Sequence, residues 1–176
     1  MSTGVCGRAV GGLQARAVTV LTCFDSAVKY ADLSMNRESN YRFSYKKMLA
    51  LSGNTAPYML YAFARINGIN RKLGEQFKID ETSEIKLEHE AELKLARHLL
   101  SLPEVINDVE TDLYPHKLCD YIFELSQRFN VFYENCPVTT APSEEQKQSR
   151  AALCAVTANS LRLILNLLGI NTVERL

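Results

Sequence analysis

Residues 53–72 read GNTAPYMLYAFARINGINRK, and at about 100° per residue this run divides into two stripes of a single helix. One stripe is apolar and supplies the face that a packed helix needs: Met59, Ala62, Phe63, Ile66, Ile69 and Leu73. The other stripe is aromatic and basic: Tyr58, Tyr61, Arg65, Gly68 and Lys72. The second stripe fits two interpretations, a seam between helices or a surface that stacks the bases of single-stranded RNA and binds its phosphates.

Helical patterns continue on both sides of this run. Asn54 or Thr55 is a good N-cap for the central helix, and Gly74 is its expected end. A short helix is predicted over 44–51, a polar connector over 75–87, and two helices over 88–101 and 103–113, separated at Pro103. Because no segment alternates as a strand does, the predicted fold is an all-α bundle of five to six helices.

The two strongest amphipathic helices lie in the second half of the chain. The first covers 116–134, with apolar residues at helical spacing: Leu118, Tyr121, Ile122, Leu125, Phe129, Phe132 and Tyr133. The second begins at a capping box formed by Ser143 and Gln146 and runs to Leu168. Its predicted buried face contains Leu153, Val156, Leu161, Ile164, Leu167 and Leu168.

Length and composition are those of one globular domain. The chain has 176 residues, of which 47% are hydrophobic and 23% charged, and no apolar run approaches the ~20 residues that span a bilayer. We therefore expect no membrane partner. Five widely spaced cysteines without a CxxC pair favour reduced thiols in the cytoplasm.

The net charge of zero conceals an asymmetry. Residues 25–80 contain nine Lys/Arg and five Asp/Glu, a balance of +4, whereas residues 81–176 contain nine and fifteen, a balance of −6. Residues 1–24 add +2. The positive part includes the stripe of Tyr58 and Tyr61, which is the sign that a phosphate backbone requires.

The sequence contains little that indicates catalysis. It has no GxxxxGK or GxGxxG loop, and His116 with Cys119 is too weak a pair to indicate a metal. The acids at 88, 90 and 92 favour the start of a helix rather than acid–base chemistry. No nucleophile stands beside a base, so the residues alone predict a binding module without catalytic or metal-ligating residues.

Several separated strings resemble arginyl-tRNA synthetases of class I, in particular the cytosolic eukaryotic type. They are AVKYADL at 27–33, NYRFS at 40–44, GNTAPY at 53–58, LYAFARI at 60–66, PHKLCDY at 115–121, and LLGI at 167–170 followed by VERL at 173–176. The resemblance covers about residues 26–176 in the family's order. It implies the C-terminal, DALR-type anticodon-binding domain of that family.

The resemblance also implies a domain division and a site. Residues 1–25 would be a divergent or disordered segment, 26–52 a remnant of the end of the catalytic domain, and 53–176 the anticodon-binding helical domain. The residues expected to face the anticodon loop of an arginine tRNA are Gly53, Tyr58, Tyr61, Arg65, Lys72 and Leu176. In the family the last residue is usually methionine, whereas here it is Leu176.

The motifs that hold ATP and position arginine in the family, of the HIGH and KMSKS types, are absent from this sequence. We therefore expect a tRNA-binding portion of a ligase without catalytic activity of its own, and no cofactor in this chain, ATP and Mg²⁺ belonging to the full-length family. Expected partners are arginine tRNA and a separate catalytic domain or a synthetase complex. The alternative is a helical protein-interaction module without RNA binding. The expected location is cytoplasmic, or organellar if the acid-free residues 1–24 act as a transit peptide.

Overall fold

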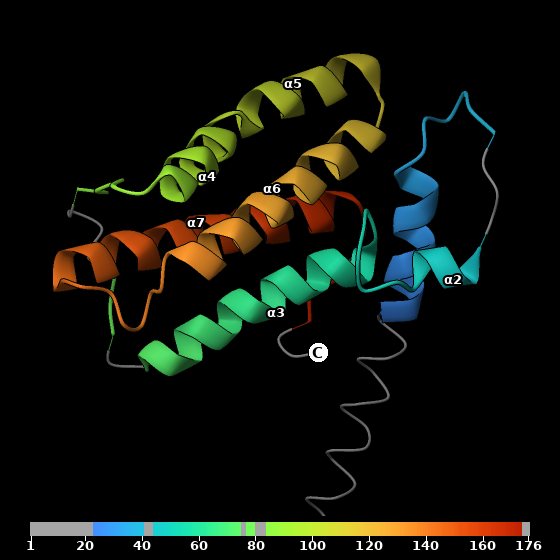
Figure 1. The fold of residues 1–176 in the computed structure, drawn as a ribbon. Helices are drawn as coiled ribbons and strands as arrows, with labels where there is room; N and C mark the ends of the chain where they lie inside the picture. Colours follow the sequence, from blue (N-terminus) through green and yellow to red (C-terminus); the bar gives the residue numbers. More distant parts are fainter. Residues whose placement is uncertain (1–22, 41–43, 75–76, 80–83, 174–176) are drawn as a thin grey trace, which may run out of the picture.

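The computed structural model describes residues 23–40, 44–74, 77–79 and 84–173. Within these ranges the chain contains helices and no strand. A first helix covers residues 23–33. It is followed by α2 (Tyr45–Met48), α3 (Ala56–Leu73), α4 (Glu90–Leu100), α5 (Leu102–Asp112), α6 (His116–Asn135) and α7 (Glu144–Leu167). The predicted all-α bundle is therefore confirmed (Figure 1).

Helix α6 is the central element of the bundle, because it contacts α3, α4, α5 and α7. In Figure 1, α3 lies on one side of α6, and α4 and α5 lie on the other. Helix α7 also contacts α3 and α4. Fully buried side chains fill the space between the helices: Phe63, Ile66, Leu95, Ile122, Leu125, Phe129, Phe132, Leu161 and Ile164. This packing buries the apolar stripe of α3 and leaves the opposite side of that helix on the surface.

The two ends of α3 are fixed by residues that the sequence singles out. The side chain of Thr55 accepts a hydrogen bond from the N–H of Tyr58 and donates one to the carbonyl of Ala50 at 2.7 Å. Gly74 ends the helix with a φ of 85°, a conformation that favours glycine. The helix predicted over 44–51 is shorter, since the chain turns back at Ala50 to meet Thr55 and α2 ends at Met48.

A buried ion pair joins α4 to α7. Glu92 accepts from Nε of Arg150 at 2.7 Å, and the two side chains are 2% and 8% exposed. Glu92 also accepts from the N–H groups of Glu88 and His89, which completes a capping box at the start of α4. Burial raises the pKa of Glu92, but these hydrogen bonds and the Arg150 charge outweigh burial and leave its pKa below the ordinary value.

The capping box predicted for α7 forms only in part. Ser143 accepts from the N–H of Gln146 at 3.2 Å, as expected. The side chain of Gln146 instead donates to Glu88, which precedes α4. The start of α7 is therefore hydrogen-bonded to the loop before α4 and does not form a complete capping box.

The predicted buried face of α7 is wrong at two positions. Val156 and Leu167 are exposed, whereas Leu153, Leu161, Ile164 and Leu168 are buried as predicted. Small residues occupy much of the packed side instead: Ser149, Ala151, Cys154 and Ala158. Small side chains allow α7 to lie close to its neighbours, and a ranking by hydrophobicity alone passes over them.

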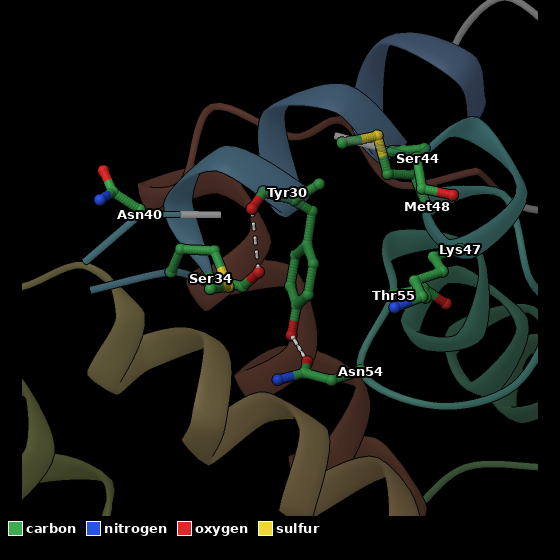
Figure 2. A pocket seen from close by; sticks show the side chains of 11 residues that line it. Tyr30, Ser34, Asn40, Ser44, Lys47, Met48, Asn54 and Thr55 are labelled. Atoms are coloured by element: carbon green, nitrogen blue, oxygen red, sulfur yellow. Dashed lines mark hydrogen bonds between the residues drawn. The ribbon is translucent and has the colours of Figure 1, made fainter. Parts of the chain in front are cut away.

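A pocket of about 350 Å³ lies where the helix over 23–33 meets α2 and the start of α3. Figure 2 shows Tyr30 reaching across it toward Asn54. The Tyr30 hydroxyl donates to the Asn54 side chain at 2.6 Å and lies 2.9 Å from the carbonyl of Cys119 in α6. Tyr30 is fully buried and belongs to the same core as α3 and α6. Tyr30 thus packs the helix over 23–33 on the bundle, while the boundaries of the predicted remnant 26–52 remain a prediction.

Replacement of Tyr30 by phenylalanine is expected to lower the free energy of unfolding by about 1–3 kcal/mol, because it removes the hydroxyl that bonds Asn54 and lies against the Cys119 carbonyl. Urea denaturation measures the change. Tyr133→Phe is the matched control: its ring is partly exposed, and we expect a change within about 0.5 kcal/mol. Equal stability of Tyr30→Phe and the parent chain would contradict this role of the hydroxyl.

Candidate nucleic-acid interface

The aromatic and basic stripe of α3 lies on the surface and borders an open groove of about 380 Å³. The groove is lined from α3 by Tyr61, Ala64, Arg65, Gly68, Ile69, Arg71 and Lys72, and from α6 by Tyr133. The structure therefore brings together three of the predicted site residues, Tyr61, Arg65 and Lys72. Tyr133 is the lining residue that comes from another helix, α6.

Arg65 is the centre of this groove. Its guanidinium carbon lies 4.7 Å from the ring centroid of Tyr61 and 4.7 Å from that of Tyr133. Cation–π attraction to both rings holds the charged group between them. One terminal nitrogen also donates to the side chain of Asn130 at 2.8 Å, and the other donates to the Tyr61 hydroxyl at 3.1 Å. Since a guanidinium has five N–H groups, these two bonds leave donors for a ligand in the groove.

Tyr58 lies one turn before Tyr61 on α3 and contacts Asn130, the residue that bonds Arg65. It is half buried, its ring packs edge-on against Phe123 at 5.9 Å, and its hydroxyl accepts from Asn130 at 2.7 Å. Asn130 therefore bonds both Tyr58 and Arg65. Tyr58 does not line the groove, and direct contact between Tyr58 and RNA stays a prediction.

The remaining predicted site residues lie apart from the groove or outside the described residues. Gly53 is exposed in the turn before α3 with a φ of 84°, and a Cβ built there meets nothing within 4 Å. Glycine is thus favoured at that position by the backbone conformation rather than by a close neighbour. Leu176 lies outside the described residues, so its predicted contact is not placed.

The sequence does not single out Arg71, which also lines the groove, nor the two site residues on α6, Asn130 and Tyr133. Tyr133 is predicted as part of the apolar face of α6, but the ring is 36% exposed and faces Arg65. Asn130 stands three residues earlier, on the same edge of α6. The only signal in the sequence is a polar residue, Asn130, one turn before a tyrosine at the edge of the apolar face of α6. That signal does not reveal that α3 packs beside this edge.

The electrostatics of the groove follow from the composition of α3. This helix contains Arg65, Arg71 and Lys72 and no acidic residue. Among the described residues, Arg65 and Lys72 form no ion pair with a carboxylate, whereas Lys86, Lys94, Lys117, Lys147, Arg128 and Arg150 all do. The charges of Arg65 and Lys72 therefore remain available to an anionic ligand.

Other kinds of site find little support in the described part of the chain. No three His, Cys, Asp or Glu side chains there gather as a metal ion requires. Burial raises the pKa of the thiols of Cys119 and Cys154 to about 12, so these cysteines stay protonated and are poor nucleophiles. None of the described helices is both long and apolar enough to cross a membrane.

These features define a class: a helical nucleic-acid-binding domain with a cationic, aromatic groove between the acid-free helix α3 and α6. The family described as "DALR anticodon binding domain" matches residues 59–176, which is more than half of the chain. The chain belongs to this family.

Known proteins with similar sequences and structures are arginine–tRNA ligases. The ligase of Nostoc punctiforme is 58% identical over 151 residues, which cover 86% of this chain and 26% of the relative. The arginyl-tRNA synthetase of Plasmodium falciparum superposes with a TM-score of 0.78 at 34% identity, covering 97% of this chain and 32% of that one. For the Thermus thermophilus enzyme the TM-score is 0.78 at 28% identity, with 86% and 26% covered.

Two facts follow from these relatives. The chain spans about a quarter of the length of the curated relatives it matches. The resemblance to arginyl-tRNA synthetases is confirmed, whereas the narrower likeness to the cytosolic eukaryotic type stays a prediction, since similar curated relatives, such as the Nostoc punctiforme ligase, come from cyanobacteria.

Proposed function

We propose that this chain binds the anticodon loop of an arginine tRNA through the groove between α3 and α6. The whole protein would then be an arginine–tRNA ligase, in which this portion holds the tRNA while a catalytic portion uses ATP and Mg²⁺ to attach arginine. The chain alone would bind RNA without catalysing that reaction. The family membership and the ligase relatives support this proposal.

The observation that carries the proposal is Arg65 held between Tyr61 and Tyr133. A single-stranded loop presents flat bases that stack on aromatic rings and phosphates that accept from guanidinium groups. The groove offers both kinds of partner within one small volume, and Lys72 extends its positive charge along α3. Tyr61, 44% exposed, is accessible to a base at the rim of the groove.

The test is the affinity of the chain for an anticodon stem-loop RNA of an arginine tRNA, measured by fluorescence anisotropy. We expect Tyr61→Ala to weaken binding by about 1–3 kcal/mol, since each stacked base contributes roughly that amount. Tyr61→Phe keeps the ring and should retain most of the affinity. Tyr45→Ala removes a tyrosine of comparable exposure on α2 and should change nothing. If Tyr61→Ala binds as tightly as the parent chain, the groove is not the RNA site.

A further inference from the structure

Arg162 of α7 lies against the opposite flank of α3 from the groove. Its guanidinium carbon is 5.2 Å from the ring centroid of Phe63, a residue of α3 that is 1% exposed. Phe63 and Arg65 are two positions apart on α3, so their side chains leave the helix about 200° apart. Arg65 contacts α6, whereas Phe63 contacts Arg162 where α3 packs against α7. Two arginines thus stand on the two flanks of one helix.

The neighbours of Arg162 one turn away on its own helix include exposed polar residues and no acid. The side chain is exposed, and it forms no ion pair with any carboxylate that the structure describes. Asn159 and Asn166 stand three residues before it and four after it on α7, and both are exposed. Helix α7 has no acidic residue after Glu145, and α3 has none at all. The acids of the described helices lie on the helix over 23–33, on α4, α5 and α6, and in the first turn of α7.

The surface of α3 between Arg65 and Arg162 includes small side chains. Ala64 and Gly68 form part of the groove wall one turn apart, and they carry the smallest side chains on the exposed side of the helix. A Cβ at Gly68 would meet only the side chain of Arg71, at 3.7 Å. The backbone of α3 is therefore accessible to RNA over Ala64 and Gly68, beside the cationic side chain of Arg71, at a place where cations stand on both sides.

We propose that Arg162 is a second phosphate-binding residue, and that RNA held in the groove crosses α3 over Ala64 and Gly68 to reach α7. This inference rests on the proposed function, because it takes the occupant of the groove to be single-stranded RNA. Phe63 holds the guanidinium against the seam by a cation–π contact, and its remaining N–H groups face solvent, where they bind phosphate oxygens. The RNA footprint then spans α6, α3 and α7 instead of following α3 alone.

The experiment compares the full chain with Arg162→Ala, Arg162→Lys and Arg97→Ala, using the same stem-loop RNA between about 50 and 200 mM salt. Arg97 is an exposed arginine on α4, which lies on the other side of α6 from α3 in Figure 1. We expect Arg162→Ala to weaken binding by about fivefold to tenfold and to reduce the salt slope by about 0.7, the contribution of one contact to a single strand. Arg162→Lys should keep the slope, and Arg97→Ala should match the parent chain.

Tyr61→Ala, measured in parallel, separates the two proposals. If Tyr61→Ala weakens binding while Arg162→Ala retains the parent affinity and salt slope, the crossing over α3 is wrong and the groove remains the RNA site. If neither variant weakens binding, both proposals are wrong. An equal loss for Arg162→Ala and Arg97→Ala would also overturn the inference, because the effect would then be one of overall charge. Because Arg162 is exposed, thermal unfolding of its variants should match that of the parent.

Discussion

Arg150→Met is expected to lower the free energy of unfolding by about 3–5 kcal/mol, because it leaves the carboxylate of Glu92 buried without its cation. The loss extends beyond the ion pair, since Arg150 also donates to the carbonyl of Pro137 in the loop between α6 and α7. Against a typical stability of about 5–15 kcal/mol, this single change removes a large fraction. Denaturant unfolding followed by circular dichroism measures it.

The matched control is Glu92→Gln combined with Arg150→Met. In that double variant the neutral amide oxygen still accepts from the N–H groups at the start of α4, and no charge is buried. We expect the double variant to be more stable than Arg150→Met alone. If the two are equally unstable, the loss comes from the packing of the arginine and not from the unpaired carboxylate.

The same reasoning predicts how pH changes the difference in unfolding free energy between the parent chain and Arg150→Met. In the parent chain the pKa of Glu92 is lowered, so its contribution to stability is present above the unfolded pKa and is lost as pH falls through the folded pKa. In Arg150→Met the Glu92 carboxylate is buried without a cation, and its protonation removes the free-energy cost of that buried charge. The gap between parent and variant should therefore begin to narrow above a pH of about 4.3, the ordinary pKa of glutamate, as the variant is protonated, and should narrow further below it as the parent loses its stabilising carboxylate.

Arg65→Ala should cause the largest loss of RNA affinity of any single change in the groove, at least about 2 kcal/mol, or roughly 30-fold. The substitution removes the cation and also the contact that fixes Tyr61 and Tyr133 in place. It leaves Asn130 bonded to Tyr58 alone. Fluorescence anisotropy with the anticodon stem-loop RNA measures the affinity.

Arg65→Lys distinguishes charge from geometry. Lysine keeps the positive charge but has no planar group to lie between two rings and to donate to Asn130 and Tyr61 together. We expect it to recover the salt dependence of the parent chain but only part of the affinity. Full recovery by lysine would show that the groove requires a cation and not the arrangement seen here.

The fold was predictable because its signals are local. Thr55, Gly74 and Ser143 act at the ends of helices through groups a few residues away, and their positions are confirmed. The errors arise where a distant segment competes for a group. Gln146 bonds Glu88 instead of its own helix end, and Val156 is exposed because smaller residues fill the packed side of α7.

The candidate site was predictable only along one helix. The period of α3 places Tyr61, Arg65 and Lys72 on one side, and the structure finds all three at the groove. Asn130 and Tyr133 on α6, and Arg162 on α7 with its proposed role, are not revealed by that period, because it says nothing about which helix lies beside α3. Tyr58 shows the same limit of prediction from one helix. It belongs to the predicted stripe, but the structure packs its ring against Phe123 and bonds its hydroxyl to Asn130.

The contacts of Arg65 have a consequence for the thermodynamics of recognition. An arginine side chain carries about 2 kcal/mol of rotamer entropy, which an unrestrained surface arginine loses when a ligand immobilises it. Here two rings and Asn130 already hold the side chain in the free protein, so much of that entropy is lost during folding. RNA binding then immobilises few further protein groups, and the groove should present nearly the same arrangement before and after the loop arrives.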